Sequence, residues 1–270
     1  MKYNRNNQIK KILLQRQKVT NTELCEMFNV SIETIRRDLN QLEREGIITK
    51  VYGGAVLAQK DQAQELVNSW TVRVDENRAA KHAIARTTSE MIPDDCTVFL
   101  DSGTSTLEIA RFLKEKQNIT VVTSSLYTAA ELASSENLTV YCIGGLVNTK
   151  TLATAGFLAL EFISFFSHFD FAVISSDGFV PDEGATDHVM ETAILKKNIL
   201  EKADKIILAL DHTKFNQRAK CITCQTDRIN TLVTDYGVSQ EILEQLHLSG
   251  VHVVVADPDL DDIGLDYVEG

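Results

Sequence analysis

The stretch Ser31-Ile-Glu-Thr-Ile-Arg-Arg-Asp-Leu39 decides the fold of the N-terminal part of the chain. At about 100° per residue, a helix through it places Ile32, Ile35, Leu39 and Leu42 within a sector about 60° wide. Ser31 precedes this helix, and its hydroxyl can accept a hydrogen bond from an N–H that the first turn leaves unpaired. The sequence therefore predicts an amphipathic helix that buries one apolar stripe.

The opposite face of the predicted helix is polar and rich in basic and amide side chains. Guanidinium and amide groups can pair in a bidentate manner with guanine and adenine edges. A solvated surface helix would show a similar face, so the neighbouring segments decide between the two interpretations. The residues on this face are Thr34, Arg37, Asn40, Gln41 and Arg44, with Arg36 at its boundary.

Two shorter helical patterns precede Ser31. Apolar residues recur at helical spacing in residues 4–17, and Thr20 or Asn21 can cap a second helix over residues 23–28. Only two residues separate that helix from Ser31. Two short helices joined by a tight turn, the second with a basic polar face, predict a helix-turn-helix.

A hairpin pattern follows the helix-turn-helix. Gly46 is expected to end the third helix. Residues 47–56 then predict a β-hairpin with Gly53-Gly54 at its bend. Three helices and a small hairpin form a winged helix, and Lys50 and Tyr52 would lie on its wing, where they can contact phosphate or the minor groove.

These residues together resemble the N-terminal signature of the DeoR family of bacterial transcription regulators. The resemblance lies in the spacing of Arg5, Ile9 and Leu13, in Ser31 with Thr34-Ile35-Arg36-Arg37-Asp38-Leu39, and in the wing Tyr52-Gly53-Gly54-Ala55. It implies a double-stranded DNA operator as partner. The residues from which we expect DNA contacts are Thr20, Ser31, Thr34, Arg36, Arg37, Asn40, Gln41, Lys50 and Tyr52.

The charge of the chain is divided unevenly along its 270 residues, a length that suits two domains. Residues 1–57 hold ten Lys and Arg and six Asp and Glu, a net charge of +4, which leaves −15 for the remainder and −11 for the whole. Only the N-terminal module is therefore suited to approach a polyanion. We expect a DNA-binding domain over residues 1–57, a polar linker over residues 58–74 and a second domain over residues 75–270.

The sequence predicts a cytoplasmic protein with no membrane partner. Residues 1–8 are polar, and no apolar segment of a signal peptide follows them. The longest apolar run, residues 153–166, contains Glu161 and is too short to span a bilayer. Five scattered cysteines suit a reducing compartment better than a disulfide framework.

The pair Cys221-Ile-Thr-Cys224 is the one motif with metal-ligand spacing. A zinc site needs two more convergent ligands, and His212 is the only nearby candidate in the sequence. Two incidental thiols are the simpler interpretation, with a metal or redox site as the alternative. We therefore expect no metal and no cofactor.

Strands and helices alternate through the second domain. Continuously apolar β-rich runs predict strands buried on both faces, and their alternation with helices predicts a mostly parallel, doubly wound α/β sheet. The predicted strands are residues 97–100, 119–123, 138–143, 169–175, 205–210, 231–234 and 251–255. The predicted helices are residues 77–91, 106–115, 127–134, 157–166, 188–202 and 240–246.

Polar motifs follow most of these strands. Doubly wound sheets bind ligands beyond the carboxyl ends of their strands. Residues 101–106, which open a helix, offer hydroxyls, one glycine and unpaired N–H groups, a combination suited to an anion. An N-capping turn explains that loop alone, but several polar strand ends in succession predict one pocket for a phosphate and sugar hydroxyls. The residues proposed to line it are Asp101, Ser102, Gly103, Thr104, Ser105, Thr106, Ser124, Gly144, Gly145, Asp177, Glu191, Asp211 and Lys214.

The resemblance to the DeoR family extends through this half of the chain. It rests on residues 100–104, on Gly144-Gly145 and on Asp211-His212-Thr213-Lys214-Phe215. It implies a sensor domain similar in fold to ribose-5-phosphate isomerase and a phosphorylated sugar as effector. Ser124 and Ser175-Ser176-Asp177 depart from the usual family pattern, which leaves the identity of the sugar open.

The sequence thus predicts a transcriptional repressor of carbohydrate-metabolism genes, with an N-terminal winged helix-turn-helix and a C-terminal doubly wound α/β sensor domain. A homo-oligomer is expected, because one short recognition helix gives limited specificity and paired half-sites overcome that limit. Two alternatives stay open. One is a sugar-phosphate isomerase or hydrolase that uses Asp177, Glu191 and Lys214. The other is an activator whose α/β body only oligomerises.

Overall fold

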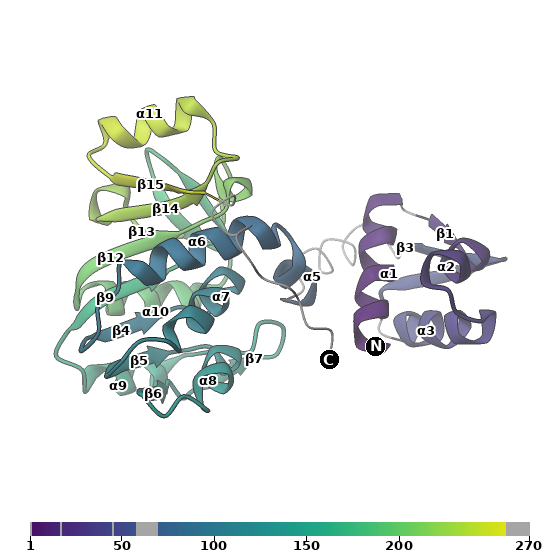
Figure 1. Ribbon diagram of the computed structural model, residues 1–270, viewed down its shortest axis with the longest axis horizontal. Helices are drawn as coiled ribbons and strands as arrows, with labels where there is room; N and C mark the ends of the chain where they lie inside the picture. The colour runs from purple at the N-terminus through teal and green to yellow at the C-terminus, as the bar shows by residue number, and fades with distance from the viewer. Residues whose placement is uncertain (1, 17, 45, 58–69, 258–270) are drawn as a thin grey trace. The chain divides into compact units, whose positions relative to one another are not determined.

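The computed structural model describes residues 2–16, 18–44, 46–57 and 70–257 (Figure 1). The chain forms two compact units, Met1–Glu76 and Asn77–Gly270. Most of the predicted linker, residues 58–69, lies outside the described residues. The end of that segment is helical, because helix α5 covers Trp70–Asp75 within the first unit.

The first unit contains a winged helix. Its helices are α1 (Lys2–Arg16), α2 (Asn21–Phe28) and α3 (Ile32–Arg44), and its strands are β1 (Lys18–Thr20), β2 (Ile48–Val51) and β3 (Gly54–Leu57). The strands form an antiparallel sheet in the order β1-β3-β2. The three predicted helices and the hairpin are confirmed. Strand β1 was not predicted, because three residues are too few to show an alternating pattern.

The apolar stripe of α3 forms part of the core of this unit. Ile35, Leu39 and Leu42 are buried as predicted, in a cluster with Ile9, Leu13, Val19, Leu24, Ile48 and Ala55. The prediction for Ile32 was wrong, since its side chain is 38% exposed. Ile32 is the first residue of α3 and lies one turn before the first position that reaches the core.

Asp38 is a charged residue on the buried side of α3. Its side chain is 1% exposed, and its Oδ2 accepts a hydrogen bond from Arg5 Nε at 2.6 Å. Arg5 lies on α1, so this ion pair fixes α1 against the recognition helix. Burial of a carboxylate costs free energy unless a charge and hydrogen bonds compensate it. The pair therefore holds a polar group in the core and sets the orientation of α3.

The wing hairpin differs in one detail from the prediction. Val51 pairs with Gly54, so the two-residue bend is Tyr52-Gly53, and Gly54 belongs to β3. Gly53 adopts the left-handed conformation that the bend requires, with φ of 79°. Gly54 is needed for another reason: a Cβ there would lie 2.1 Å from the carbonyl oxygen of Val19 on β1. The second glycine thus permits close pairing of the strand that was not predicted.

The second unit is built on a seven-stranded parallel sheet, which confirms the predicted doubly wound α/β class (Figure 1). The strand order is β15-β14-β12-β9-β4-β5-β6. The strands are β4 (Thr97–Leu100), β5 (Ile119–Thr123), β6 (Leu138–Cys142), β9 (Phe169–Ile174), β12 (Ala203–Ala209), β14 (Thr231–Asp235) and β15 (His252–Ala256). The helices are α6 (Arg78–Glu90), α7 (Thr104–Leu113), α8 (Leu126–Leu132), α9 (Phe157–Ser164), α10 (Met190–Leu200) and α11 (Gln240–Leu248).

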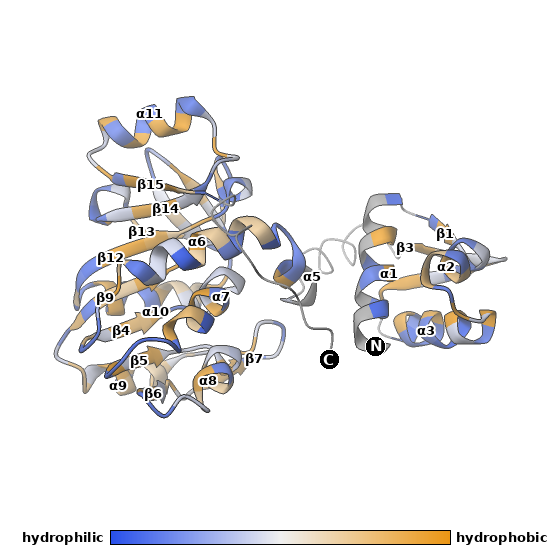
Figure 2. Cartoon of the chain, viewed as in Figure 1, coloured by the Kyte–Doolittle hydropathy of each residue, from blue (hydrophilic) through white to orange (hydrophobic). Residues whose placement is uncertain are grey.

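Helices cover both faces of this sheet and create two separate hydrophobic cores. Side chains of α6, α7 and α8 pack on one face, with Ile84, Ile109 and Leu132 among them. Side chains of α9, α10 and α11 pack on the other face, with Ile163 and Leu195 among them. Figure 2 shows the central strands as mainly hydrophobic and the covering helices as mixed. Burial on both faces is why these strands are continuously apolar.

Two small antiparallel sheets accompany the main sheet. One has the order β10-β11-β13, from β10 (Gly178–Val180), β11 (Gly184–Asp187) and β13 (Cys221–Cys224). The other pairs β7 (Leu146–Asn148) with β8 (Ala153–Ala155). The sequence did not predict these strands, because each has three or four residues and none is a long apolar run.

We expect the Arg5–Asp38 pair to contribute measurably to stability. Arg5→Met should destabilise the winged helix by about 3 kcal/mol, because it leaves the Asp38 carboxylate buried without its charge partner. Urea unfolding of the full chain, followed by circular dichroism, measures the effect. Arg44→Met is the control, since Arg44 is exposed on α3, the helix that carries Asp38, and should change stability by less than about 0.5 kcal/mol. Equal effects in both variants would contradict a role for the ion pair.

Candidate functional site

The polar face of α3 lies in solvent, as predicted for a DNA-contacting helix. Arg36, Arg37 and Gln41 are exposed, while Thr34 and Asn40 are half-buried. A shallow depression in this surface is lined by Glu33, Arg36, Arg37, Asn40, Gln41 and Arg44. Three arginines, Arg36, Arg37 and Arg44, therefore line one surface of α3, on the side turned away from its core.

The hydroxyls of Thr20 and Ser31 are engaged in local capping. Thr20 Oγ1 accepts a hydrogen bond from the Glu23 N–H at 3.2 Å, and its own N–H donates to Glu23 Oε2 at 2.7 Å, which completes a capping box on α2. Ser31 Oγ lies 3.4 Å from the Thr34 N–H and 3.1 Å from Thr34 Oγ1. These residues position the two helices of the helix-turn-helix, and their DNA contacts stay a prediction.

The two predicted wing residues have different surroundings. Tyr52 lies at the bend of the hairpin and is fully exposed. Lys50 turns back toward α3, where its Nζ donates to Asn40 Oδ1 at 2.6 Å and lies 3.2 Å from Glu43 Oε2. Glu43 thus partly compensates the charge that Lys50 was predicted to offer to phosphate.

The candidate effector site lies where the direction of the parallel sheet reverses. From β4 the chain adds β5 and β6 on one side, and then adds β9, β12, β14 and β15 on the other. The carboxyl ends of β4 and β9 are therefore the switch point of the sheet, the position at which doubly wound sheets bind ligands. Asp101, Ser102 and Gly103 follow β4, and Ser175, Ser176 and Asp177 follow β9.

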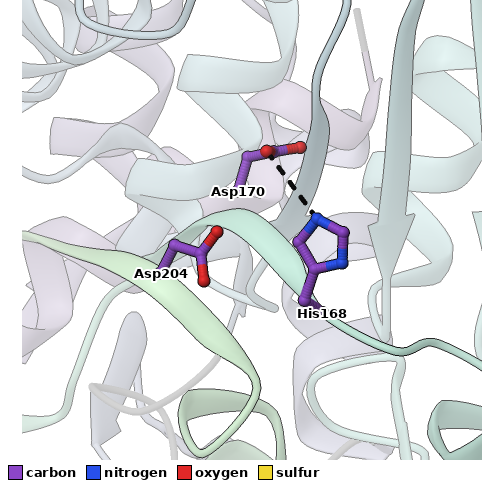
Figure 3. Close-up of side chains that lie close together, drawn as sticks. All are labelled: His168, Asp170 and Asp204. Atoms are coloured by element: carbon purple, nitrogen blue, oxygen red, sulfur yellow. Dashed lines mark ion pairs between the residues drawn. The ribbon is translucent and has the colours of Figure 1, made fainter.

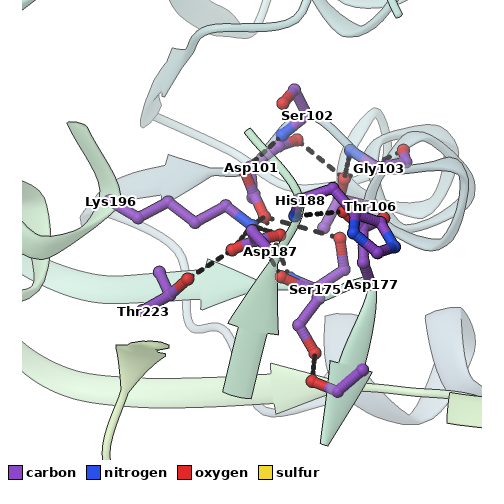
Figure 4. Close-up of polar contacts among 12 residues, drawn as sticks. Asp101, Ser102, Gly103, Thr106, Ser175, Asp177, Asp187, His188, Lys196 and Thr223 are labelled. Atoms are coloured by element: carbon purple, nitrogen blue, oxygen red, sulfur yellow. Dashed lines mark hydrogen bonds and ion pairs between the residues drawn. The ribbon is translucent and has the colours of Figure 1, made fainter. Parts of the chain in front are cut away.

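A buried lysine joins these two loops, and the sequence analysis did not identify it (Figure 4). Lys196 of α10 lies 2.7 Å from Asp101 Oδ2 and 3.0 Å from both carboxylate oxygens of Asp187, and it donates to the Ser175 carbonyl at 2.8 Å. Thr223 Oγ1 of β13 donates to Asp187 Oδ2 at 2.5 Å. The one ammonium group connects β4, β9 and β11, and Thr223 extends the network to β13.

One signal in the sequence marks Lys196. Three apolar residues lie three or four positions from Lys196 in the sequence and therefore share its side of α10: Ala193, Ile199 and Leu200. A lysine on the apolar side of a helix is a candidate for a buried ion pair. Its neighbour Lys197 lies about 100° further round the helix and is exposed.

Burial and charge act in opposite directions in this network. Burial by itself would lower the pKa of Lys196, but the nearby Asp101 and Asp187 carboxylates outweigh it and the pKa is raised. Burial raises the pKa of Asp187, against the lowering effect of Lys196. Lys196 thus stays protonated at neutral pH, and it is the group that permits two carboxylates to be buried side by side.

Asp101 and Thr106 hold the loop after β4 in shape. Asp101 is 1% exposed; its Oδ1 accepts from the Ser102 N–H at 2.7 Å, and its Oδ2 accepts from the Ser175 N–H at 3.1 Å. Thr106 Oγ1 accepts from the Gly103 N–H at 2.7 Å and also lies 2.7 Å from the Asp101 carbonyl oxygen. These groups already have partners inside the protein, so Ser102, Thr104 and the first-turn N–H groups of α7 are the parts of this loop best suited to a ligand.

The other predicted effector residues differ in exposure. Ser124 and Ser105 are buried, Gly145 is half-buried, and Gly144 and Glu191 are exposed. Ser124 follows β5, Gly144-Gly145 follows β6, and Glu191 lies in the first turn of α10. The strand ends meet at one edge of the sheet, whereas Glu191 belongs to a covering helix. Their contact with a ligand stays a prediction.

The charged residues at the ends of β9 and β12 are partly engaged. Asp177 is half-buried, and its Oδ2 accepts from the His188 N–H at 2.9 Å. Asp211 is buried, and its Oδ1 accepts from the Thr213 N–H and from Asn77 Nδ2, each at 3.1 Å. Lys214 is half-buried at the end of the 3₁₀ turn η1 (His212–Lys214). Asp211 therefore caps the turn that positions Lys214.

The candidate metal-ligand groups lie away from the carboxyl ends of β4 and β9. Cys221 and Cys224 are three positions apart on strand β13, so their side chains point to opposite faces, and burial raises the pKa of the Cys224 thiol to about 11. His168, Asp170 and Asp204 offer ligand atoms within 4.8 Å of one another (Figure 3). They lie at the amino ends of β9 and β12, at the opposite edge of the sheet, and Asp170 Oδ2 already accepts from the Thr97 N–H.

We expect Lys196 to be essential for the stability of the sensor domain. Lys196→Met should destabilise it by about 3–5 kcal/mol at neutral pH, because two carboxylates would be left buried without a cation. The loss should be smaller at acidic pH, where Asp187, whose pKa is raised by burial, can be protonated and part of the charge that has to be buried disappears. Thermal unfolding of the full chain at several pH values measures both effects.

Lys197→Met is the matched control for this experiment. It removes the same charge from an exposed position on the same helix and should change stability by less than about 0.5 kcal/mol. A Lys196→Met variant as stable as Lys197→Met, or one whose loss does not depend on pH, would show that the network contributes little.

Among the helices in the described part of the chain, none combines the length and the apolar character that a bilayer-spanning helix needs. Comparison with solved structures gives low-level similarity. A ribose 5-phosphate isomerase A from Neisseria gonorrhoeae is 14% identical, with a TM-score of 0.39, over 51% of this chain and 53% of that one.

Comparison with known sequences gives stronger similarity. The chain is 33% identical to the HTH-type transcriptional regulator GolR of Listeria innocua, over 94% of this chain and 99% of the relative. It is 31% identical to the HTH-type transcriptional regulator IolR of Bacillus subtilis, over 94% and 100%. It is also 31% identical to the glycerol-3-phosphate regulon repressor of Escherichia coli, over 90% and 94%.

Family models match both units of the chain. The DeoR-like helix-turn-helix domain matches residues 5–61, which include the recognition helix and the wing. The DeoR C terminal sensor domain matches residues 76–236, which include β4, β9 and the loops that follow them. The chain therefore belongs to the DeoR family of DNA-binding transcriptional regulators.

Proposed function

We propose that this protein is a cytoplasmic repressor of carbohydrate-metabolism genes and that a phosphorylated sugar changes its affinity for its operator. The observation that carries the proposal is the switch point between β4 and β9, where polar residues and the N-terminus of α7 follow the strand ends, in a chain that also has a helix-turn-helix. A relative named as the repressor of a glycerol-3-phosphate regulon supports both the repression and the kind of genes.

DNA binding is assigned to the exposed face of α3. Arg36, Arg37 and Gln41 have the side chains that pair with base edges in the major groove, and Tyr52 on the wing is free to reach the sugar–phosphate backbone. The buried Arg5–Asp38 pair beneath this face supports a fixed helix orientation. Because Lys50 is partly compensated by Glu43, its contribution to phosphate binding should be smaller than that of a free lysine.

Effector binding is assigned to the loop that opens α7. The first N–H groups of a helix have no partner within the helix and favour an anion. The half-buried hydroxyls of Ser102 and Thr104 add further donors beside them. The second anchor is Lys214, whose half-buried position at the edge of the sheet suits contact with a phosphate or a sugar oxygen. We expect the strand-end hydroxyls between them to contact the sugar.

The role as a sensor is favoured over that of an enzyme. Of the acid, base and cation expected for catalysis, Asp177 already accepts a hydrogen bond from the His188 N–H, and Glu191 lies exposed on α10. The more deeply buried charged groups, Asp101 and Lys196, compensate each other and have no role left as acid or base. Sensing needs only a difference in affinity between two states, about 1–3 kcal/mol.

We expect a homo-oligomer to bind the operator. Each chain offers one recognition helix, and paired half-sites are the usual way for a helix-turn-helix protein to reach specific affinity. The effector would then act by changing the spacing or orientation of the paired winged helices. An activator would share these features, so the sign of regulation has to come from a transcription assay with and without the effector.

Arg37 should be a base-contacting residue. Arg37→Ala should weaken operator binding by about 1–3 kcal/mol and relax sequence preference, because a bidentate contact with a base would be lost. Gel-shift titrations of the full chain at several salt concentrations measure the loss. Lys220→Ala, which removes an exposed charge from the sensor domain, is the control and should bind as the wild type. Unchanged operator affinity in Arg37→Ala would refute the assignment of the recognition face.

A phosphorylated sugar should raise the melting temperature of the full chain, and the corresponding free sugar should raise it much less. Thr104→Val should reduce this shift, because it removes a phosphate donor at nearly constant volume. Thr87→Val, at a half-buried position on α6, should keep it. NMR of the same samples should show unchanged ligand. No shift with a broad panel of sugar phosphates would refute the effector assignment, and steady product formation would favour the enzyme.

A further inference from the structure

Five large apolar side chains are exposed together on the sensor domain. Each is between 43% and 75% exposed, whereas scattered single residues would need no explanation. They come from a small strand and from the N-terminal parts of two helices. We name them the β7–α9–α10 patch: Leu146 of β7, Phe157 and Leu158 of α9, and Met190 and Ile194 of α10.

Strand β8 joins the parts of this patch. Leu146 pairs with Ala155 across the two small strands, and a Cβ at Gly156 would lie 3.9 Å from the Leu146 Cβ. Gly156 immediately precedes Phe157, so Leu146 lies beside the start of α9. Helices α9 and α10 both pack against β8 and against each other. The exposed side chains therefore surround one strand and form one surface.

The patch is large enough to matter for association. If a fully exposed large apolar side chain presents about 200 Å², the five exposures together amount to on the order of 600 Å². This is at the upper end of the roughly 300–600 Å² of the largest apolar patch on a typical monomer. It also approaches the ~800 Å² that each partner contributes to a standard protein interface.

The charge distribution indicates which partner fits. The chain outside residues 1–57 has a net charge of −15, so two copies repel each other over most of their surfaces. Between Glu136 and Glu161, however, 24 consecutive residues contain no Asp or Glu, and β7, β8 and the first turn of α9 lie within them. The part of this surface from β7, β8 and α9 can meet its own copy without facing carboxylates, and Glu191 is the exposed acid beside it on α10. DNA or a strongly acidic partner would need basic side chains there.

We infer that the β7–α9–α10 patch is the surface through which two copies of this chain associate. A two-fold interface needs a patch that is complementary to itself, and an apolar patch that is poor in acidic residues meets this condition. The inference rests on the proposed function in one respect, the need for two recognition helices on one operator. The exposure and the charge pattern support it independently of that function.

A charge placed in the patch tests this inference. Leu158→Glu introduces a carboxylate at a position that is 66% exposed, so the fold should be kept. In a two-fold dimer the two carboxylates would be buried in one interface, and self-association should weaken by about 100-fold or more. Sedimentation velocity of the full chain over nanomolar to micromolar concentrations measures the dissociation constant, and circular dichroism confirms folding. If Leu158→Glu proves unfolded, Met190→Glu repeats the test from α10.

Leu248→Glu is the matched control. It makes the same substitution at an 86% exposed leucine of helix α11, outside the patch, and should associate as the wild type. A monomeric wild type, unchanged association in Leu158→Glu, or an equal loss in Leu248→Glu would each overturn the inference. Operator titrations of the same proteins separate the two proposals: a wild type that dimerises through the patch but binds no DNA would refute only the proposed function.

Discussion

The ammonium group of Lys196 is the contact on which the sensor domain depends. It lies between Asp101 and Asp187 and also donates to the Ser175 carbonyl. Three segments that are far apart in the sequence therefore share one buried cation. Burial of either carboxylate alone would be costly, and burial of both without Lys196 would be more costly still. The loops after β4 and β9 are therefore held together by this one group and by Asp101.

The network also separates buried from accessible polar groups. The charged side chains at the end of β4 and in β11 are turned inward, where one ammonium group contacts two carboxylates. The half-buried groups beside them are the hydroxyls of Ser102 and Thr104 at the N-terminus of α7, and Lys214 at the end of the turn that follows β12. Under the proposed function, these are the groups from which we expect contacts with a phosphorylated sugar.

The sequence predicted the parts of the fold that depend on long apolar patterns. Strands at residues 97–100 and 119–123 were predicted to the residue, because their side chains are buried on both faces. The short strands β10, β11 and β13 have no such pattern; they pair with one another, and Asp187 of β11 connects them to Lys196 of α10. The apolar pattern of a sequence can locate a strand whose own side chains are buried on both faces. It cannot locate a strand whose pairing depends on residues distant in sequence.

The candidate site shows the same division. The rule for parallel sheets placed Asp101, Asp177 and Asp211 at one edge, but their roles depend on contacts that no local pattern contains. Asp101 pairs with a lysine 95 positions away in sequence, and Asp211 accepts from Asn77, 134 positions away. The sequence thus identified where polar groups gather, while the structure identified which of them are already satisfied.

Both domains place a buried ion pair directly beneath a proposed contact surface. Arg37 points to solvent on α3, while its neighbour Asp38 points inward to Arg5. Ser102 is half-buried after β4, while its neighbour Asp101 points inward to Lys196. In each pair of adjacent residues, one side chain is thus accessible and the other is held by an ion pair inside the protein. A substitution at Asp38 or Asp101 therefore removes a buried contact, whereas one at Arg37 or Ser102 leaves the ion pair in place.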